Sequence, residues 1–236
     1  MNPIIVCGDS HADPFWKNGL DYFYSHPECK FIFLGDYLDP YPQEGFTRED
    51  AIENFKEILQ FARENRDRVI LLLGNHDYWM IDSIYDSCRH DYKNWEYIHQ
   101  LFEENEDLFK VAYLEENYLF THAGITKGWL IEHNLQDKSV EELVDYMNED
   151  YDNVWHIGFS RGGWFENGSP IWACLLGDWI RRNCSNPFDG ITQIFSHTRL
   201  EKGMPYHDEK KNIYMMDVRN CFLLENDKFI LLSPEN

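Results

Sequence analysis

Short apolar runs along the chain each end abruptly in polar residues. Five runs have the length of a buried strand, at residues 4–7, 31–34, 69–73, 118–120 and 191–195. Asp, Asn or His follows each run, usually after a glycine. In α/β sheets the carboxyl ends of the strands share one crevice, so these polar residues are expected to meet there.

Between these runs, other segments carry apolar residues at helical spacing. They predict helices over residues 14–25, 47–65, 125–133, 139–148 and 175–182. The sequence Thr47-Arg48-Glu49-Asp50 has the form of a capping signal at the start of one of them. These helices are long enough to cover the faces of a sheet.

Further strands are expected later in the chain. Residues 109–113 and 118–120 are expected to pair as a hairpin. Three runs are expected to finish the chain as antiparallel strands, at residues 213–217, 221–224 and 229–232. The mixture of elements predicts an α/β fold with mixed sheets and helices outside them.

The length of the chain suits one large domain. It has 236 residues, of which 43% are hydrophobic, which is enough for a sizeable core. No linker rich in Ser, Gly or Pro and no repeat divides it. We therefore expect a single domain over residues 1–236, in which residues 77–107 and 125–190 form helical or loop insertions near the functional site.

Composition limits the partners and the compartment. The 42 acidic and 21 basic residues give a formal charge of −21, which argues against binding to nucleic acid and favours a neutral or cationic partner. The six cysteines show no CxxC pair, so we expect reduced core thiols. No basic leader is present and no run approaches the about 18 apolar residues of a membrane span. A soluble, cytoplasmic protein without a membrane partner is expected.

The polar residues after the strand-like runs are of metal-ligand types. Asp9 and His11 stand two residues apart, so their side chains lie on one side of an extended segment. Asp36 is our candidate for a carboxylate that bridges two metal ions. Histidine and carboxylate together suit Mn, Fe or Zn. One such group alone would most often be a turn or a cap, but five in order at strand ends favour a shared site.

Five sequence blocks stand in the order and spacing of calcineurin-like metallophosphoesterases. They are Gly8-Asp9-Ser10-His11, Gly35-Asp36-Tyr37-Leu38-Asp39, Gly74-Asn75-His76-Asp77, Thr121-His122-Ala123-Gly124 and Ser196-His197-Thr198. The chain resembles this family over about residues 4–200. The second block is most similar to the Ser/Thr phosphoprotein phosphatases, including phage and bacterial members, and to the related dinucleoside polyphosphate hydrolases. The resemblance implies a four-layer α-β-β-α sandwich with mixed β-sheets.

The resemblance also implies a role for each ligand. Asp36 would bridge two divalent or transition metal ions, with Mn, Fe or Zn as candidates and Mn the expected ion in vitro. The remaining ligands would be Asp9 and His11 for the first ion, and Asn75, His122 and His197 for the second. Ions about 3.5 to 4 Å apart would activate a bridging hydroxide that attacks phosphorus in line with the leaving oxygen. Two such ions would also leave a net positive site inside an acidic protein.

His76 is not a ligand in this scheme. In the family the histidine after the ligand asparagine protonates the leaving alkoxide, and Asp39 matches the carboxylate that pairs with it. A carboxylate at this place would favour the protonated imidazole. His76 and Asp39 together therefore resemble the general acid.

The chain departs from the phosphoprotein phosphatases at the phosphate contact. These enzymes usually have Arg-Gly after the second Asp of the block, whereas this chain has Pro40. Arg161, in a glycine-rich stretch, is our first candidate for the missing phosphate-binding arginine, and Arg199 is the second. The usual Glu after the catalytic histidine is Asp77 here. These departures concern the substrate rather than the metal site.

The sequence therefore favours a dinuclear metal-dependent phosphoric ester hydrolase. A phosphomonoesterase similar to Ser/Thr protein phosphatases is expected, acting on a phosphoprotein or a small phosphate ester. A nucleotide or dinucleoside polyphosphate hydrolase is the alternative among enzymes. An inactive binding scaffold that kept the fold is the alternative of another class, and the complete ligand set counts against it. The sequence leaves the substrate, the native metals and the oligomeric state open.

Overall fold

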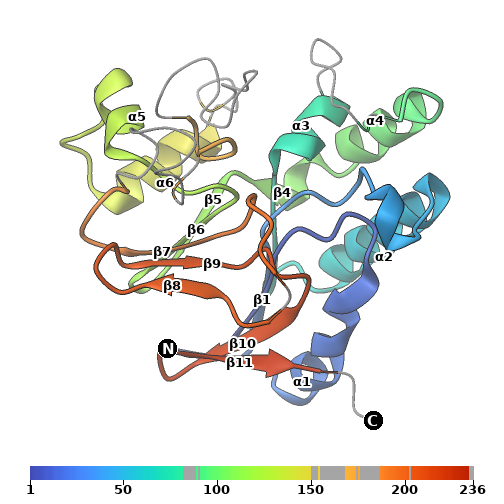
Figure 1. The fold of residues 1–236 in the computed structure, drawn as a ribbon, viewed down its shortest axis with the longest axis horizontal. Coiled ribbons are helices and arrows are strands. Elements are labelled where there is room, and N and C mark those ends of the chain that lie inside the picture. The colour runs from blue at the N-terminus through green and yellow to red at the C-terminus, as the bar shows by residue number, and fades with distance from the viewer. Residues whose placement is uncertain are drawn as a thin grey trace.

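The computed structural model describes residues 1–81, 89, 91–149, 154, 168–173, 175, 187–201 and 203–233. Within these ranges the chain forms two mixed sheets with helices on their outer faces (Figure 1). None of the described helices combines the length and the apolar character that a membrane span requires. The expected helix at residues 175–182 lies almost entirely outside the described residues.

The first sheet is built from the two ends of the chain. Its strands are β1 (Ile4–Cys7), β2 (Lys30–Phe33), β3 (Val69–Leu72), β4 (Phe109–Lys110), β10 (Cys221–Glu225) and β11 (Lys228–Leu232). They stand in the order β11-β10-β1-β2-β3-β4. The strands from β1 to β4 run parallel, whereas β10 and β11 are antiparallel additions. The carboxyl ends of β1, β2 and β3 therefore lie along one edge.

The second sheet is built from the part of the chain between β4 and β10. Its strands are β5 (Ala112–Glu115), β6 (Tyr118–Thr121), β7 (Thr192–Phe195), β8 (Tyr206–Asp208) and β9 (Ile213–Met215). They stand in the order β5-β6-β7-β9-β8, with β6, β7 and β9 parallel. The short, mostly exposed strand β8 was not expected because its residues carry no apolar run.

The helices cover the outer faces of the two sheets. They are the 3₁₀ helices η1 (Pro14–Gly19), η2 (Pro42–Glu44) and η3 (Glu106–Leu108), and the α-helices α1 (Leu20–Ser25), α2 (Arg48–Glu64), α3 (Asn75–Ile81), α4 (Trp95–Glu103), α5 (Lys127–Glu132) and α6 (Val140–Glu149). Figure 1 shows α1 to α4 on the side of the first sheet and α5 and α6 beside β5 and β6. The predicted capping box at Thr47 and Asp50 begins α2. This arrangement is the expected four-layer sandwich.

Alternating strand residues divide the core into two parts. Ile4 and Val6 of β1 pack with Phe120 and Ile194 in a core between the sheets. The intervening residues Ile5 and Cys7 face the other way, into the core shared with α1 and α2. Because both faces of β1 are buried, the strand reads as a continuous apolar run rather than an alternating one.

Two expected strand pairings are only partly correct, since β5 with β6 and β10 with β11 form antiparallel pairs as expected. Residues 109–110 pair with β3 in the first sheet, and only β5 forms the hairpin with β6. The Asn148 side chain accepts hydrogen bonds from the backbone N–H groups of Val111 and Ala112, at 2.8 and 3.1 Å, where the chain crosses between sheets. Similarly, β9 and β10 belong to different sheets, and a turn containing Asp217 and Arg219 joins them.

Candidate metal centre

The predicted ligands meet at the carboxyl ends of strands from both sheets. Asp9 follows β1, Asp36 follows β2 and Asn75 follows β3, while His122 and His197 follow β6 and β7. Five of the six predicted ligands, including His11, are buried, and the sixth, His197, is half-buried. We call Asp9, His11 and Asp36 the first half of the centre. Asn75, His122 and His197 form the second half.

In the first half, hydrogen-bond acceptor atoms of His11, Asp9 and Asp36 face one another. The His11 Nδ1 atom lies 2.7 Å from the carbonyl oxygen of Leu38. Because a carbonyl oxygen only accepts hydrogen bonds, Nδ1 carries the proton and donates a hydrogen bond to this oxygen. The His11 Nε2 lone pair then faces the Asp36 and Asp9 carboxylates, at 3.6 and 3.9 Å. Lone pairs that converge without a proton between them suit a cation.

The second half repeats this arrangement with neutral metal ligands. The His122 Nδ1 atom lies 2.6 Å from the Leu34 carbonyl oxygen, which leaves Nε2 as an acceptor. This Nε2 lies 3.0 Å from Asn75 Oδ1 and 3.5 Å from Asp36 Oδ2. His197 Nδ1 lies 2.8 Å from the same Asn75 oxygen. Since Asp36 Oδ2 faces both His11 and His122, its carboxylate is placed to bridge two ions, and the donor set fits Mn, Fe or Zn.

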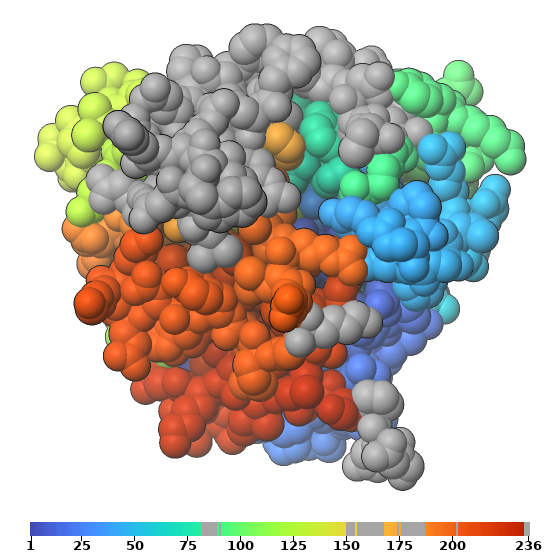
Figure 2. Space-filling view, viewed as in Figure 1, coloured from blue at the N-terminus to red at the C-terminus, as the bar shows by residue number. Residues whose placement is uncertain are grey.

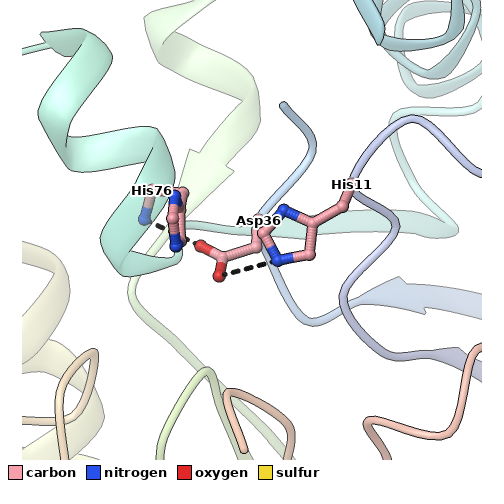
Figure 3. A group of neighbouring side chains, drawn as sticks. All are labelled: His11, Asp36 and His76. Carbon is pink, nitrogen blue, oxygen red and sulfur yellow. Dashed lines mark hydrogen bonds and ion pairs between the residues drawn. The ribbon is translucent and has the colours of Figure 1, made fainter. Parts of the chain in front are cut away.

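His76 lies beside the first half. One ligand atom each from His11, Asp36 and His76 lie within 4.8 Å of one another, as do those of Asp36, His122 and His197. Figure 3 shows the Asp36 carboxylate between the His11 and His76 rings. One imidazole nitrogen of His76 is engaged elsewhere, since Nδ1 lies 2.6 Å from Asp39 Oδ2. The predicted acid pair is therefore in contact, within reach of the candidate ligands.

The pKa of His76 is set by opposing effects. Burial lowers this pKa, the Asp39 carboxylate raises it and the Arg89 guanidinium lowers it further. The net direction of the pKa shift is downward, because burial outweighs the Asp39 carboxylate. A phosphate dianion beside the ring would act in the same direction as Asp39.

The carboxylates of the centre are crowded in a buried place. Burial, followed by the charges of Asp9 and Asp77, raises the pKa of Asp36 well above its usual value. Burial likewise lowers the pKa of both His11 and His122. Divalent cations at this place would favour the ionised carboxylates and the neutral imidazoles.

Unusual backbone angles shape the loops of the centre. His11, Asp36 and His197 have φ angles of 42°, 56° and 68°, in the left-handed region that non-glycine residues rarely adopt. Glycine is required at position 74, because a Cβ atom there would overlap the Asp36 carboxylate. The loops are thus held in a conformation that local preference alone does not explain.

Hydrogen bonds to Asp77 help to hold these loops in place. Its carboxylate accepts hydrogen bonds from the backbone N–H groups of Asp36, Tyr37 and Gly74, at 2.7, 3.0 and 2.8 Å. It is fully buried, and burial raises its pKa to about 7. The sequence showed Asp77 as a mild departure from the usual Glu, but gave no sign that it ties together the loops carrying Asp36 and Asn75.

The predicted phosphate-binding arginines are placed differently from one another. Arg161 lies outside the described residues. Arg199 forms an ion pair with Glu44 and stacks on Tyr41, at the rim rather than among the metal ligands.

Two arginines that sequence reasoning missed also lie close to the centre. The Arg89 Nη2 atom is 3.5 Å from His76 Nε2, and its Nε donates to the Asp39 carbonyl oxygen at 3.0 Å. Arg219 donates to the carbonyl oxygen of Asp9.

Asp217, which follows the apolar run of β9, could have been found by the pattern that identified the other strand ends.

Comparison with known proteins agrees with this geometry. Residues 2–213 match the family described as calcineurin-like phosphoesterase. The fold is similar to that of a cold-active protein-tyrosine phosphatase from the psychrophile Shewanella sp., with 15% identity, a TM-score of 0.62 and coverage of 98% of this chain and 77% of that one. It is also similar to a Saccharomyces cerevisiae protein serine/threonine phosphatase, with 16% identity, a TM-score of 0.61 and coverage of 100% and 81%. The chain belongs to the calcineurin-like phosphoesterase family of hydrolases.

Proposed function

We propose that this protein is a dinuclear metal-dependent phosphomonoesterase. The observation that carries the proposal is the Asp36 carboxylate, whose Oδ2 faces the unprotonated nitrogens of His11 and His122 at 3.6 and 3.5 Å. A single carboxylate between two imidazole acceptors is an arrangement for two cations.

The ligand roles follow from the two halves of the centre. The first half would hold one ion, the second half would hold the other, and Asp36 would contact both. When bound, the ions supply positive charge for the phosphate and an activated water molecule. The protein's part is to keep the ligands in place, through the Leu34 and Leu38 carbonyl oxygens behind His122 and His11 and through Asp77 behind the loops.

His76 would deliver the proton to the leaving oxygen. Its Nδ1 is held by Asp39 at 2.6 Å, so Nε2 is the nitrogen that faces the substrate. The Asp39 carboxylate fixes the orientation of the ring and stabilises its protonated form. The proton would pass from His76 Nε2 to the alkoxide as the phosphorus–oxygen bond breaks.

Arg89 is placed to orient the phosphoryl group. Its Nη2 lies 3.5 Å from His76 Nε2, so the guanidinium extends to the place where the leaving oxygen would lie. A planar fork of donors suits phosphate oxygens better than a point charge. Arg161 and Arg199, which the sequence suggested for this contact, stay predictions.

The test combines metal analysis with turnover. Purified protein should contain up to two transition metal ions per chain by elemental analysis. It should hydrolyse an aryl phosphate, lose this activity with a chelator and regain it with Mn. A protein that takes up no transition metal, or that hydrolyses the ester equally well after chelation, would contradict the proposal. An inactive scaffold would bind metal without turnover.

A further inference from the structure

Three arginines gather around one aromatic ring next to the metal centre. The guanidinium carbons of Arg89, Arg199 and Arg219 lie 3.8, 4.8 and 5.3 Å from the centre of the Tyr41 ring. The chain has twice as many acidic as basic residues, so such a gathering runs against its composition. Like charges held this close repel one another unless an anion compensates them.

Part of the compensation comes from a carboxylate that two of the arginines share. Arg199 forms an ion pair with Glu44, and Arg219 Nε lies 3.4 Å from the same carboxylate. Figure 2 shows the segment after β7, in orange, meeting the blue segment around η2 on this face of the molecule. Arg219 also contacts Asp217, at 3.2 Å.

Arg219 retains a donor that no described residue of the protein accepts. Its side chain is only 1% exposed, and among the described residues its Nη2 atom has no hydrogen-bond partner. Its Nη1 donates to the carbonyl oxygen of Asp9, which joins the cluster to the first half of the centre. A buried guanidinium with an unsatisfied donor is costly unless a ligand supplies further negative charge.

The arginine cluster contacts the catalytic groups through the Tyr41 ring. The Tyr41 ring meets the His11 ring edge-on, with ring centroids 4.9 Å apart. The centroids of the His11 and His76 rings are 5.0 Å apart. Arg89 stacks on Tyr41 and reaches His76. Arg199 is 33% exposed, so this side of the cluster is accessible to a ligand.

We propose that Tyr41, Arg199 and Arg219 form a subsite for a second phosphate of the substrate, adjacent to the one that is hydrolysed. This inference rests on the proposed function and gives it a substrate class, molecules with two neighbouring phosphoryl groups. A phosphate offers several oxygens and more than one negative charge, which matches a cluster of planar donors better than a single carboxylate does. Arg89 would lie between the two phosphates.

The first experiment measures binding without metal. Calorimetric titration of chelator-treated protein should show inorganic pyrophosphate binding at least about tenfold more tightly than orthophosphate. Arg199→Ala should remove this preference, and Arg199→Lys should restore only part of it because the fork is lost. Arg66→Ala is the matched control, since this half-exposed arginine pairs with Asp107 at the opposite end of β3. Equal affinities for the two anions in the parent protein would overturn the proposal.

The second experiment compares two substrates in Mn-loaded protein. In adenosine 5′-diphosphate an anhydride bond joins the terminal phosphate to a neighbouring phosphate, whereas adenosine 5′-monophosphate carries a single ester phosphate without a neighbour. The ratio of kcat/KM for the diphosphate to that for the monophosphate should fall about tenfold in Arg199→Ala and stay constant in Arg66→Ala. Equal losses on both substrates would overturn the subsite and assign Arg199 to the scissile phosphate.

Two further outcomes separate this inference from the proposed function. A phosphopeptide with neighbouring acidic residues that outcompetes the diphosphate, in an Arg199-dependent way, would contradict a second phosphate as the ligand. If the parent hydrolyses neither the two nucleotides nor an aryl phosphate, the proposed function fails. The pyrophosphate titration would still decide the subsite, and thermal melting of each variant would verify that it is folded.

Discussion

The two halves of the candidate metal centre differ in charge and in origin. The first half has two carboxylates and one imidazole, and all three residues follow strands of the first sheet. The second half has only neutral donors, of which Asn75 comes from the first sheet while His122 and His197 come from the second. Among the ligands of an ion in the second half, the shared Asp36 carboxylate is the only charged group.

This difference predicts unequal affinities. A divalent ion gains more from anionic ligands than from neutral ones, so the first half should hold its ion more tightly. The second half also depends on the packing of one sheet on the other, through the core that contains Phe120 and Ile194. We therefore expect the second half to be emptied first, by a chelator or by mutation.

The largest effect should follow from Asp36→Asn, because this change affects both halves. The carboxylate that faces His11 and His122 loses its charge while its size is kept. We expect loss of both tightly bound ions by elemental analysis and loss of measurable turnover. Asp21→Asn, an exposed change on α1, is the control. Two ions and parental activity in Asp36→Asn would disprove the bridging role.

The next largest effect should distinguish the halves. His122→Asn should empty the second half and leave one ion bound, with a loss of several kcal/mol of transition-state stabilisation, on the order of 10³-fold in rate. His11→Asn should retain more metal because Asp9 and Asp36 remain beside that ion. Chelator titrations followed by elemental analysis would compare the two variants. If His11→Asn lost its metal at the lower chelator concentration, the argument from charge would be wrong.

The sequence predicted the parts of this centre that depend on local patterns. An apolar run followed by glycine and a polar residue indicates a strand end wherever it occurs, so Asp9, Asp36 and Asn75 were found before the fold was known. The capping box of Thr47 is equally local. The family resemblance then supplied the four-layer arrangement of helices and sheets, which local patterns do not contain.

What was missed depends on contacts between distant segments. Residues 109–115 have the same apolar pattern whether they form one strand or two, and Asn148, far along the chain, accompanies the crossing between sheets. Arg89 and Arg219 are ordinary arginines in sequence, and only the folded chain brings them to Tyr41. The left-handed φ angles of His11 and His197 are likewise a property of the assembled loops.

A smaller effect is expected from a change at His76, which belongs to neither half. His76→Asn should leave the metal content unchanged and slow hydrolysis by about 10² to 10⁴, the usual contribution of general acid catalysis. Alkyl esters should suffer more than nitrophenyl esters, because nitrophenolate leaves without a proton. His207→Asn, at an exposed position, is the control. Equal slowing on both ester types would remove His76 from the acid role, and a loss of metal would make it a ligand.

The smallest effect is expected from Asp77, which contacts no substrate and acts on both halves through the backbone. Its two oxygens accept N–H groups from the loops carrying Asp36 and Asn75. Asn in its place would turn one acceptor into a donor that faces an N–H group, which typically costs about 1–3 kcal/mol. We expect Mn affinity or activity to fall by about 10- to 100-fold, the usual effect of removing a partner behind the ligands. If Asp77→Asn melts at a lower temperature but binds Mn and turns over like the parent, Asp77 stabilises the fold without positioning the ligands.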